Sequence, residues 1–436
     1  MNDTIYYNRR QQFFNLLDDG VAVLSAAEYM TRSNDTEYPF RQESNFYYLS
    51  GITEDQCIMV FEKRDGVTKS YLFVKEVSEQ ESLWVGERMG IEGASLAYTF
   101  DEVLNIDTFE EKMPELLTNL PKLYYDIFGT STLCDTLKLT CKALMHKRGV
   151  LKSPRTFSDV YKLIQRLRLI KTDDEINLIK KALSITKEAH HRAMKQAEAG
   201  KNEFQISAEI AYVFASHGAG HNAYENIVAG GNRANTLHYI DNDKVLEDAT
   251  LVLIDAGCEY DMYASDITRT FPISGKFSEA QRELYEMILE VQLQIIEMIK
   301  PGISKKVIQE ASERVLTEGM MRLGILKGER DALIEEKVHK KYYPHGIGHW
   351  MGIDVHDPSP YVDDEGEQII FEAGMVLTIE PGIYIDEQDD EVPQRYRGMG
   401  IRIEDNILVT ASGCENLSKG IAKSVAEIEA QCASSL

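Results

Sequence analysis

The chain has 436 residues, of which 43% are hydrophobic and 27% are charged, so it is globular in composition and too long for one ordinary core. Its 47 Lys and Arg against 71 Asp and Glu give a formal net charge of 47 − 71 = −24. This balance argues against binding to nucleic acid or to an anionic membrane, because both need a basic surface.

Targeting and redox signals are also lacking in the sequence. The N-terminus shows no basic start followed by an apolar stretch, and no apolar run approaches the ~18 residues of a membrane span. The six cysteines are scattered and include no CxxC pair, which argues against a disulfide framework or a Cys-ligated zinc site. We therefore expect a cytoplasmic protein without a membrane partner.

Two domains are expected along the chain. Residues 1 to about 155 mix short strand-like runs, such as 57–61 and 70–74, with helical stretches. The segment 149–153 before Pro154 is typical of a domain junction. We place the boundary after residue 160, which gives domains of 1–160 and 161–436.

Capping patterns predict the helices of the second domain. Thr172 with Glu175, and Ser278 with Gln281, are capping-box pairs that mark helix starts. The three predicted helices cover about 172–199, 278–300 and 304–323. The predicted strands around them cover 250–255, 262–271, 375–380 and 400–409. Interleaved strands and helices imply an α/β or α+β domain.

Five potential metal ligands lie in the second domain, each inside a distinctive phrase. The phrases are Ile-Asp255-Ala-Gly, Ser-Asp266-Ile-Thr-Arg-Thr, His345-Gly-Ile-Gly-His349, Thr-Ile-Glu380-Pro-Gly and Arg402-Ile-Glu404-Asp. Four carboxylates and one imidazole form a mostly hard oxygen set that suits two divalent cations such as Mn²⁺. Two bridged cations turn water into a hydroxide nucleophile near neutral pH. A hydrolase is therefore the leading interpretation.

The two aspartates lie on a predicted hairpin. Asp255 ends an apolar strand, and the return strand carries Asp266 eleven positions later. This separation brings both carboxylates to one side of the sheet, where they repel each other unless a cation compensates their charge. A lone Asp at a strand end is usually a turn former, but the second Asp weakens that interpretation.

The histidine segment and the glutamates complete the set. His345, His349 and His356 fall among glycines that disfavour a helix and allow the backbone to approach something bound. Strand alternation places Glu380 opposite its apolar neighbours, and Glu404 on the same face as Arg402. A single histidine would more often be structural, and either strand alone fits a half-buried strand with a solvated polar face. Together the five positions favour a metal site.

These phrases resemble the signature of the pita-bread metallopeptidases, and most of all their aminopeptidase P (Xaa-Pro aminopeptidase) branch. The likeness extends to the first domain through Thr31-Arg-Ser-Asn-Asp-Thr-Glu-Tyr-Pro-Phe-Arg41-Gln and Trp84-Val-Gly, and so covers essentially the whole chain. It implies a creatinase-like N-terminal domain, a pita-bread catalytic domain and two Mn²⁺ ions. It also implies a homo-oligomer, either a dimer or a tetramer.

The resemblance also implies roles for individual residues. Asp255 is expected to bind one cation, His349 with Glu380 the other, and Asp266 with Glu404 both. The candidate catalytic residues are His238, His345, His356 and Glu380. The candidate substrate-binding residues are His238, His356, Tyr384 and Arg402. Arg402 is expected to orient carboxylates rather than to contact substrate. The chain departs from the family pattern at Asp159-Val-Tyr161, where the relatives carry a Trp-Arg pair. The subunit or substrate contacts that such an arginine would make are therefore in doubt here.

The expected reaction is release of the N-terminal residue from peptides with proline at the second position. A hydroxide that bridges the cations is expected to attack the first carbonyl, and Glu380 to carry its proton to the leaving nitrogen. His238 and His356 are expected to hold the peptide and support developing charge. Trp84, Trp350 and Tyr384 are candidates for apolar walls around the proline ring.

Other activities fit these residues less well. Prolidase shares the fold and the ligands but cleaves only Xaa-Pro dipeptides. The segments Glu-Tyr-Pro-Phe-Arg-Gln and Cys258-Glu-Tyr weakly favour aminopeptidase P over prolidase. A non-enzymatic peptide-binding relative or a metal-free creatinase-type hydrolase is disfavoured because no ligand position is lost. Methionine aminopeptidase shares the ligands, but the large first domain argues against it.

Overall fold

The computed structural model describes residues 3–129, 131–147 and 152–433. It divides into two compact units, Met1–Arg168 and Leu169–Leu436. The predicted boundary after residue 160 falls at the start of α7 (Tyr161–Leu169) and stays a prediction, while the predicted junction 149–153 lies partly outside the described residues. Among the described residues, no helix has the combination of length and hydropathy that crossing a membrane requires.

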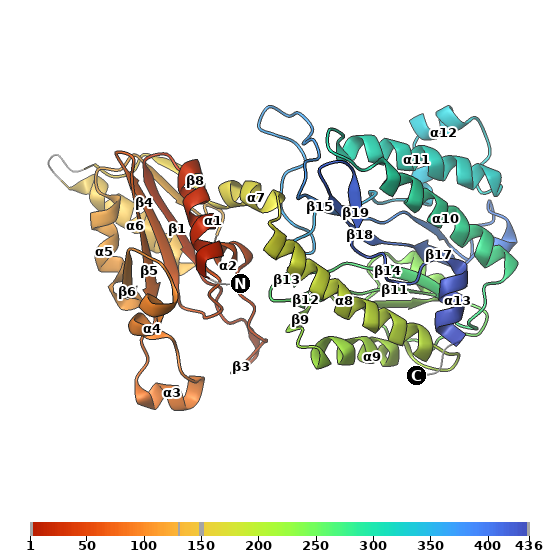
Figure 1. The fold of residues 1–436 in the computed structure, drawn as a ribbon, viewed down its shortest axis with the longest axis horizontal. Helices are drawn as coiled ribbons and strands as arrows, with labels where there is room; N and C mark the ends of the chain where they lie inside the picture. Colours follow the sequence, from red (N-terminus) through yellow and green to blue (C-terminus); the bar gives the residue numbers. More distant parts are fainter. Residues whose placement is uncertain (1–2, 130, 148–151, 434–436) are drawn as a thin grey trace. The chain divides into compact units, whose positions relative to one another are not determined.

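The first unit is built on a six-stranded sheet (Figure 1). Its strands are β1 (Gly20–Ser25), β4 (Ile58–Arg64), β5 (Val67–Val74), β6 (Glu102–Asn105), β7 (Lys122–Tyr125) and β8 (Thr156–Asp159). A separate hairpin is formed by β2 (Thr31–Ser33) and β3 (Thr36–Glu37). The sheet order is β6-β5-β4-β1-β7-β8, with β4 antiparallel to both neighbours and the other pairs parallel. The predicted strands at 57–61 and 70–74 are confirmed as β4 and β5.

The helices of this unit are α1 (Asp3–Leu16), α2 (Ser44–Ser50), α3 (Glu79–Val85), α4 (Gly90–Ala97), α5 (Phe109–Leu117) and α6 (Thr132–His146). Helices pack on both faces of the sheet, whereas α3 has no buried residue. Alternate residues of β4 point to opposite faces. Val60 therefore joins the core that α5 and α6 cover, whereas Phe61 packs edge-on against Phe13 and Phe14 of α1.

The second unit repeats an arrangement of two helices followed by an antiparallel sheet. Its helices are α8 (Asp173–Gln196), α9 (Glu203–Ser216), α10 (Glu279–Met298), α11 (Lys305–Arg322), α12 (Arg330–Glu335) and α13 (Val425–Ala433). Its first strands are β9 (His221–Asn222), β10 (Ile227–Gly230), β11 (Leu251–Asp255), β12 (Cys258–Tyr260), β13 (Tyr263–Ala264) and β14 (Thr268–Pro272). The later strands are β15 (Val376–Ile379), β16 (Gly382–Ile385), β17 (Met399–Arg402), β18 (Asp405–Val409) and β19 (Cys414–Asn416). They form the sheets β10-β11-β14, β13-β12-β9, β15-β18-β19 and β16-β17.

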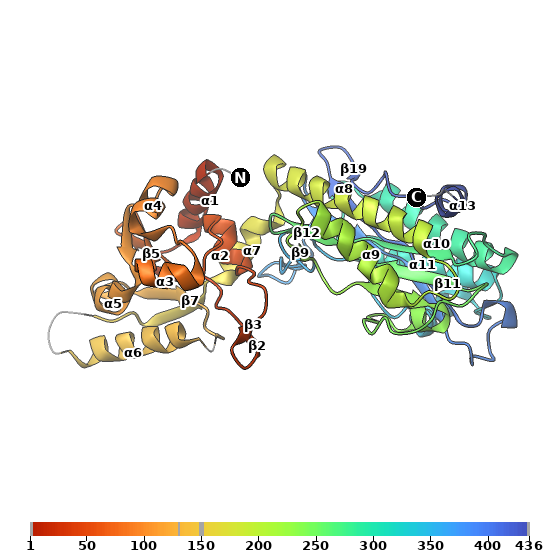
Figure 2. The ribbon, with the colours of Figure 1, turned by 90° about the horizontal axis from the view of Figure 1, so that it is seen from below.

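The three predicted helices are confirmed as α8, α10 and α11. The capping boxes begun by Thr172 and Ser278 are both complete, and Ser304 is the N-cap of α11. The first two helices of the unit, α8 and α9, lie side by side (Figure 2). The four longest helices of the unit, α8, α9, α10 and α11, share one core with Ile254 of β11 and Ile379 of β15. Because side chains alternate along a strand, the neighbouring residues Asp255 and Glu380 lie on the opposite side.

Two predicted strands are each divided in the structure, which corrects the sequence-based assignment. The predicted strand 262–271 is split into β13 and β14, and 400–409 into β17 and β18. The halves pair with different partners: β13 with β12, β14 with β11, β17 with β16, and β18 with β15 and β19. The chain must leave one ladder to enter the next. Asp266 and Glu404 lie in these two breaks rather than on strands.

A buried ion pair joins β14 to β18. Arg269 and Asp405 are 2.7 Å apart at their nearest atoms, and neither side chain is exposed. The same guanidinium donates hydrogen bonds to the carbonyls of Glu404 and Ala422. The pair therefore fixes the end of the segment that carries Glu404.

Replacing Arg269 by methionine should destabilise the protein strongly. Among the described residues, Arg269→Met leaves Lys423 and Asn416 as the remaining side-chain partners of the buried Asp405 carboxylate, so we expect the free energy of unfolding to fall by about 3–5 kcal/mol. Denaturant unfolding measures the change. The control Arg322→Met removes an exposed pair with Glu290 and should cost less than about 1 kcal/mol. Equal losses for the two variants would contradict the prediction.

Candidate metal centre

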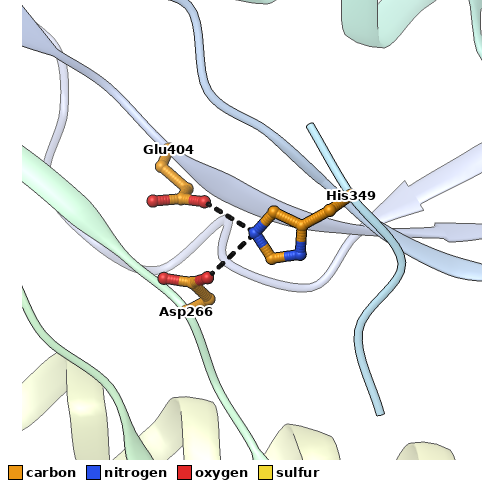
Figure 3. Close-up of side chains that lie close together, drawn as sticks. All are labelled: Asp266, His349 and Glu404. Carbon is orange, nitrogen blue, oxygen red and sulfur yellow. Dashed lines mark ion pairs between the residues drawn. The ribbon is translucent and has the colours of Figure 1, made fainter. Parts of the chain in front are cut away.

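Three of the predicted ligands meet at one point. Asp266, His349 and Glu404 each offer one ligand atom, and these atoms all lie within 4.8 Å of one another. The imidazole Nε2 of His349 is 3.3 Å from Asp266 Oδ2 and 4.0 Å from Glu404 Oε1, so it faces both carboxylates (Figure 3). The three come from segments far apart in the chain: the β13–β14 break, the glycine-rich stretch and the β17–β18 break.

Asp255 and Glu380 complete the group. The hydroxyl of Tyr224 lies 2.6 Å from Asp255 Oδ1 and 2.6 Å from Asp266 Oδ1, so the two aspartates lie close together as predicted, although Asp266 lies in the break before β14 and not on the return strand. Glu380 Oε1 lies 3.7 Å from His349 Nε2. All five predicted ligands thus surround one small volume.

Two glycines allow this convergence. A Cβ atom on Gly348 would lie 1.9 Å from the Thr378 carbonyl oxygen, and one on Gly257 would lie 1.8 Å from the Ser265 carbonyl oxygen. The close approach is thus to the protein's own backbone. At Gly348 it brings His349 beside β15, where the His349 amide donates to Thr378 Oγ1 at 3.0 Å.

The imidazole of His349 is oriented for metal binding. Its Nδ1 lies 3.0 Å from the carbonyl oxygen of Trp350. A carbonyl only accepts, so Nδ1 carries the hydrogen and the neutral ring presents the lone pair of Nε2 to the carboxylates. The side-chain amide of Asn406 holds the backbone of Asp266: Asn406 Nδ2 donates to the Asp266 carbonyl at 2.6 Å, and the Asp266 amide donates to Asn406 Oδ1 at 3.0 Å.

The charges of the five predicted ligands favour the binding of a cation. Burial, together with the charges of Asp266 and Glu380, raises the pKa of Glu404 well above its usual range. Burial also raises the pKa of Glu380 to about 7. Although burial alone lowers the pKa of His349, its hydrogen bond to Asp266 and the nearby negative charges raise it to about 9. Divalent cations would displace these protons, and the oxygen-rich donor set fits such ions.

Arg402 connects the carboxylates to the rest of the site. Its Nη2 lies 2.6 Å from Asp255 Oδ2, and its Nε donates to Thr268 Oγ1, which donates to Glu404 Oε2. Its Nη1 donates to the Tyr384 hydroxyl at 2.9 Å. Arg402 therefore makes direct contact with one predicted ligand and indirect contact with a second.

A pocket of about 310 Å³ opens onto this group. Besides the five predicted ligands, its lining includes the predicted residues His238, His345, His356 and Arg402. Apolar side chains supply another part, namely Ile227, Leu237, Ile240 and Val355. The ring of His356 packs edge-on against that of His349, with centroids 4.3 Å apart.

The predicted aromatic residues have other surroundings. Trp350 is buried, stacks on Tyr361 and donates its indole N–H to the Pro360 carbonyl. The hydroxyl of Tyr384 is shared between Arg402 and His345 Nε2, the latter at 2.8 Å. Trp84 belongs to the first unit, on α3, where it is 87% exposed.

Tyr224, Thr268 and Asn406 were not predicted from the sequence. Tyr224 and Asn406 stand outside the five ligand phrases and bind residues 42 and 140 positions away. Thr268 lies two residues after Asp266, and Asn406 lies two residues after Glu404, so proximity to a predicted ligand was the local signal for both.

Comparisons with known proteins place the chain in a family. The model named Metallopeptidase family M24 matches residues 177–411, and the model named Aminopeptidase P, N-terminal domain matches residues 6–124. An Xaa-Pro aminopeptidase of Haemophilus influenzae is 41% identical over 428 residues, which cover 97% of this chain and 96% of the relative.

Solved structures agree with the sequence comparisons. Aminopeptidase P from Escherichia coli with the inhibitor Pro-Leu has a TM-score of 0.94, and the zinc-substituted enzyme with product has a TM-score of 0.95. Each is 38% identical and covers 99% of this chain and 98% of its own. The predicted α/β fold, with an aminopeptidase P N-terminal domain and a pita-bread catalytic domain, is thereby confirmed. The chain therefore belongs to the Xaa-Pro aminopeptidases of metallopeptidase family M24.

Proposed function

We propose that this protein is a metal-dependent exopeptidase that releases the N-terminal residue from peptides whose second residue is proline. The observation that carries the proposal is the convergence of four carboxylates and one imidazole on one pocket. The relatives named Xaa-Pro aminopeptidase, and the structure of one of them with the inhibitor Pro-Leu, support the substrate class. Prolidase remains the alternative activity to test.

The ligands divide between two cations. We assign Asp255 to one cation, His349 with Glu380 to the other, and Asp266 with Glu404 to both. The central position of Asp266 and Glu404, on either side of His349 Nε2, supports a bridging role. Mn²⁺ is the proposed ion, since carboxylate oxygens dominate the donor set. When bound, the pair of cations acidifies water and polarises the scissile carbonyl.

The remaining residues bind the peptide and move the proton. Glu380 borders the pocket, 3.7 Å from His345 Nδ1, and is placed to pass a proton to the leaving proline nitrogen. His238 and His356 line the open side of the pocket and hold the peptide by donating to its carbonyl groups. Apolar lining residues, among them Leu237 and Val355, receive the proline ring.

Arg402, Tyr384 and His345 form a supporting chain. Arg402 holds Asp255 in place through their 2.6 Å ion pair. Its second contact, to the Tyr384 hydroxyl, continues to His345 Nε2. We therefore propose that Arg402 and Tyr384 act on the substrate indirectly, by fixing the ligands and His345 around it.

The oligomeric state and the cellular location of the protein are also part of the proposal. We infer an association of identical chains, a dimer or a tetramer, because Leu83, Trp84 and Val85 form an apolar run on α3 that is 84%, 87% and 62% exposed. We infer a cytoplasmic location because all six cysteines are free. We also propose that the boundary between the two domains lies between residues 160 and 161.

Turnover of a tripeptide and of a dipeptide tests the activity. Purified protein stripped with a chelator should lose cleavage of Arg-Pro-Pro and regain it with Mn²⁺, because the cations supply the nucleophile. Arg-Pro should be cleaved with a much lower kcat/KM. Cleavage of Arg-Pro alone would assign the protein to the prolidases, and cleavage of neither peptide would contradict a peptidase function.

Substitution of single ligands tests the metal assignment. Asp255→Asn and His349→Ala should each lower kcat/KM by at least about a hundredfold, because even residues that only support ligands are worth 10–100-fold. Circular dichroism should show that both variants stay folded. His217→Ala, which removes an imidazole paired with Glu188 in the same unit, is the matched control and should retain activity. Wild-type turnover by either ligand variant would refute the assignment.

A further inference from the structure

Gln292 connects the segments that carry the two glutamates. It lies within α10, and its side chain is fully buried. Its Nε2 donates to the carbonyl oxygens of Ile379 and Ile403, each at 3.1 Å. These residues immediately precede Glu380 and Glu404. One carboxamide thus holds both ligand-bearing segments at a fixed separation.

Lys423 holds the carboxamide itself in one orientation. Its Nζ donates to Gln292 Oε1 at 2.9 Å and also binds the carboxylate of Asp405. An ammonium group has donors and no acceptor, so it must face the oxygen of the amide. Both Nε2 hydrogens are then directed at the two carbonyls. A flipped amide would set its N–H groups against the ammonium.

The position of Gln292 matters because the two carbonyls lie where ordinary strand pairing changes. Ile379 is the last residue of β15, and Ile403 lies in the break between β17 and β18. Without the shared donor, each of these buried carbonyl oxygens would lose a hydrogen bond, and their dipoles would push the segments apart. The separation of Glu380 and Glu404 would then widen.

We propose that Gln292 is a positioning residue that sets the separation of Glu380 and Glu404 and thereby the affinity for divalent cations. The inference rests on the proposed function, in which both glutamates are metal ligands. Helix α10 thereby supports the metal site by holding two backbone carbonyls next to the ligands, without contacting a cation.

Mn²⁺ titration of the metal-stripped protein tests the proposal. Gln292→Met keeps the volume of the side chain but removes both donors, and should weaken Mn²⁺ binding 10–100-fold in a calorimetric titration. Electron paramagnetic resonance should show more isolated Mn²⁺ and less of the exchange-coupled pair. Lys423→Met, which frees the amide to rotate, should weaken binding in the same direction and to a smaller extent.

Gln281→Met is the matched control. Gln281 is also a buried glutamine of α10, and its Nε2 donates to the carbonyl of Ala249, away from the ligands. This variant should lose unfolding stability but keep the wild-type Mn²⁺ affinity. Unchanged affinity in Gln292→Met and Lys423→Met, or an equal loss in Gln281→Met, would overturn the proposal. A wild-type protein that binds no Mn²⁺ would instead contradict the proposed function.

Glu225 carries a second, independent inference about the substrate. It lines the same pocket, is exposed, and forms no ion pair or hydrogen bond with any other residue that the structure describes. The apolar side chain of Ile240 lines the pocket as well and is 54% exposed. An aliphatic surface next to a solitary carboxylate fits a side chain with an apolar stem and a cationic end.

The size of the pocket indicates which substrate residue meets Glu225. A volume of about 310 Å³ is at the lower end for pockets that hold small ligands, and suits the first two residues of a peptide. The second residue is proline, which is apolar. On the basis of the proposed function, we infer that Glu225 favours peptides with Arg or Lys as the first residue.

Arginine and its neutral isostere citrulline test this preference. The ratio of kcat/KM for Arg-Pro-Pro to that for citrulline-Pro-Pro should be about two- to fivefold in the wild type, as expected for an exposed charge pair, and should shrink with added salt. Glu225→Gln should bring the ratio close to one, and Glu225→Lys below one. A wild-type ratio of one, or a ratio that survives Glu225→Gln, would refute the inference. Failure to cleave either peptide would refute the proposed function instead.

Discussion

Mutual repulsion among three buried carboxylates and a partly buried fourth is the constraint around which the catalytic unit is organised. Asp255, Asp266, Glu380 and Glu404 lie close to one imidazole, where burial makes each negative charge expensive. The protein supplies partial compensation through Arg402 and the hydroxyls of Tyr224 and Thr268. The remaining charge is what two divalent cations neutralise in a dinuclear metallopeptidase, so the same residues that destabilise the metal-free pocket give it affinity for metal.

The architecture brings charged side chains to one place by interrupting its sheets. Asp266 and Glu404 occupy breaks at which the chain changes sheets, and Asp255 and Glu380 come at strand ends. The helices cover the opposite side and contribute the apolar core. Polar contacts stabilise the interruptions: Asn406 binds the backbone of Asp266, and the buried pair of Arg269 with Asp405 fixes the segment after Glu404.

The parts of this structure that local patterns govern were predictable from the sequence. Capping residues such as Thr172 and Ser278 mark helix starts because they satisfy backbone groups within one turn. The predicted ligands were identified from short phrases, and the structure brings them around one pocket.

The strand breaks and the supporting polar contacts were not predictable, because they depend on partners remote in sequence. Gln292 binds a carbonyl 111 residues away, and Arg269 is 136 residues from its partner Asp405. No glycine or proline interrupts 262–271 or 401–409, so the sequence conceals the exchange of pairing partners there. One amino-acid sequence alone does not indicate which of its strands pair with each other.

Anomalous X-ray diffraction from crystals of the protein loaded with Mn²⁺ tests the central claim most directly. The account predicts two manganese peaks, both in contact with Asp266 and Glu404, with Asp255 beside one peak and His349 with Glu380 beside the other. A single peak, or manganese bound away from these five residues, would contradict it.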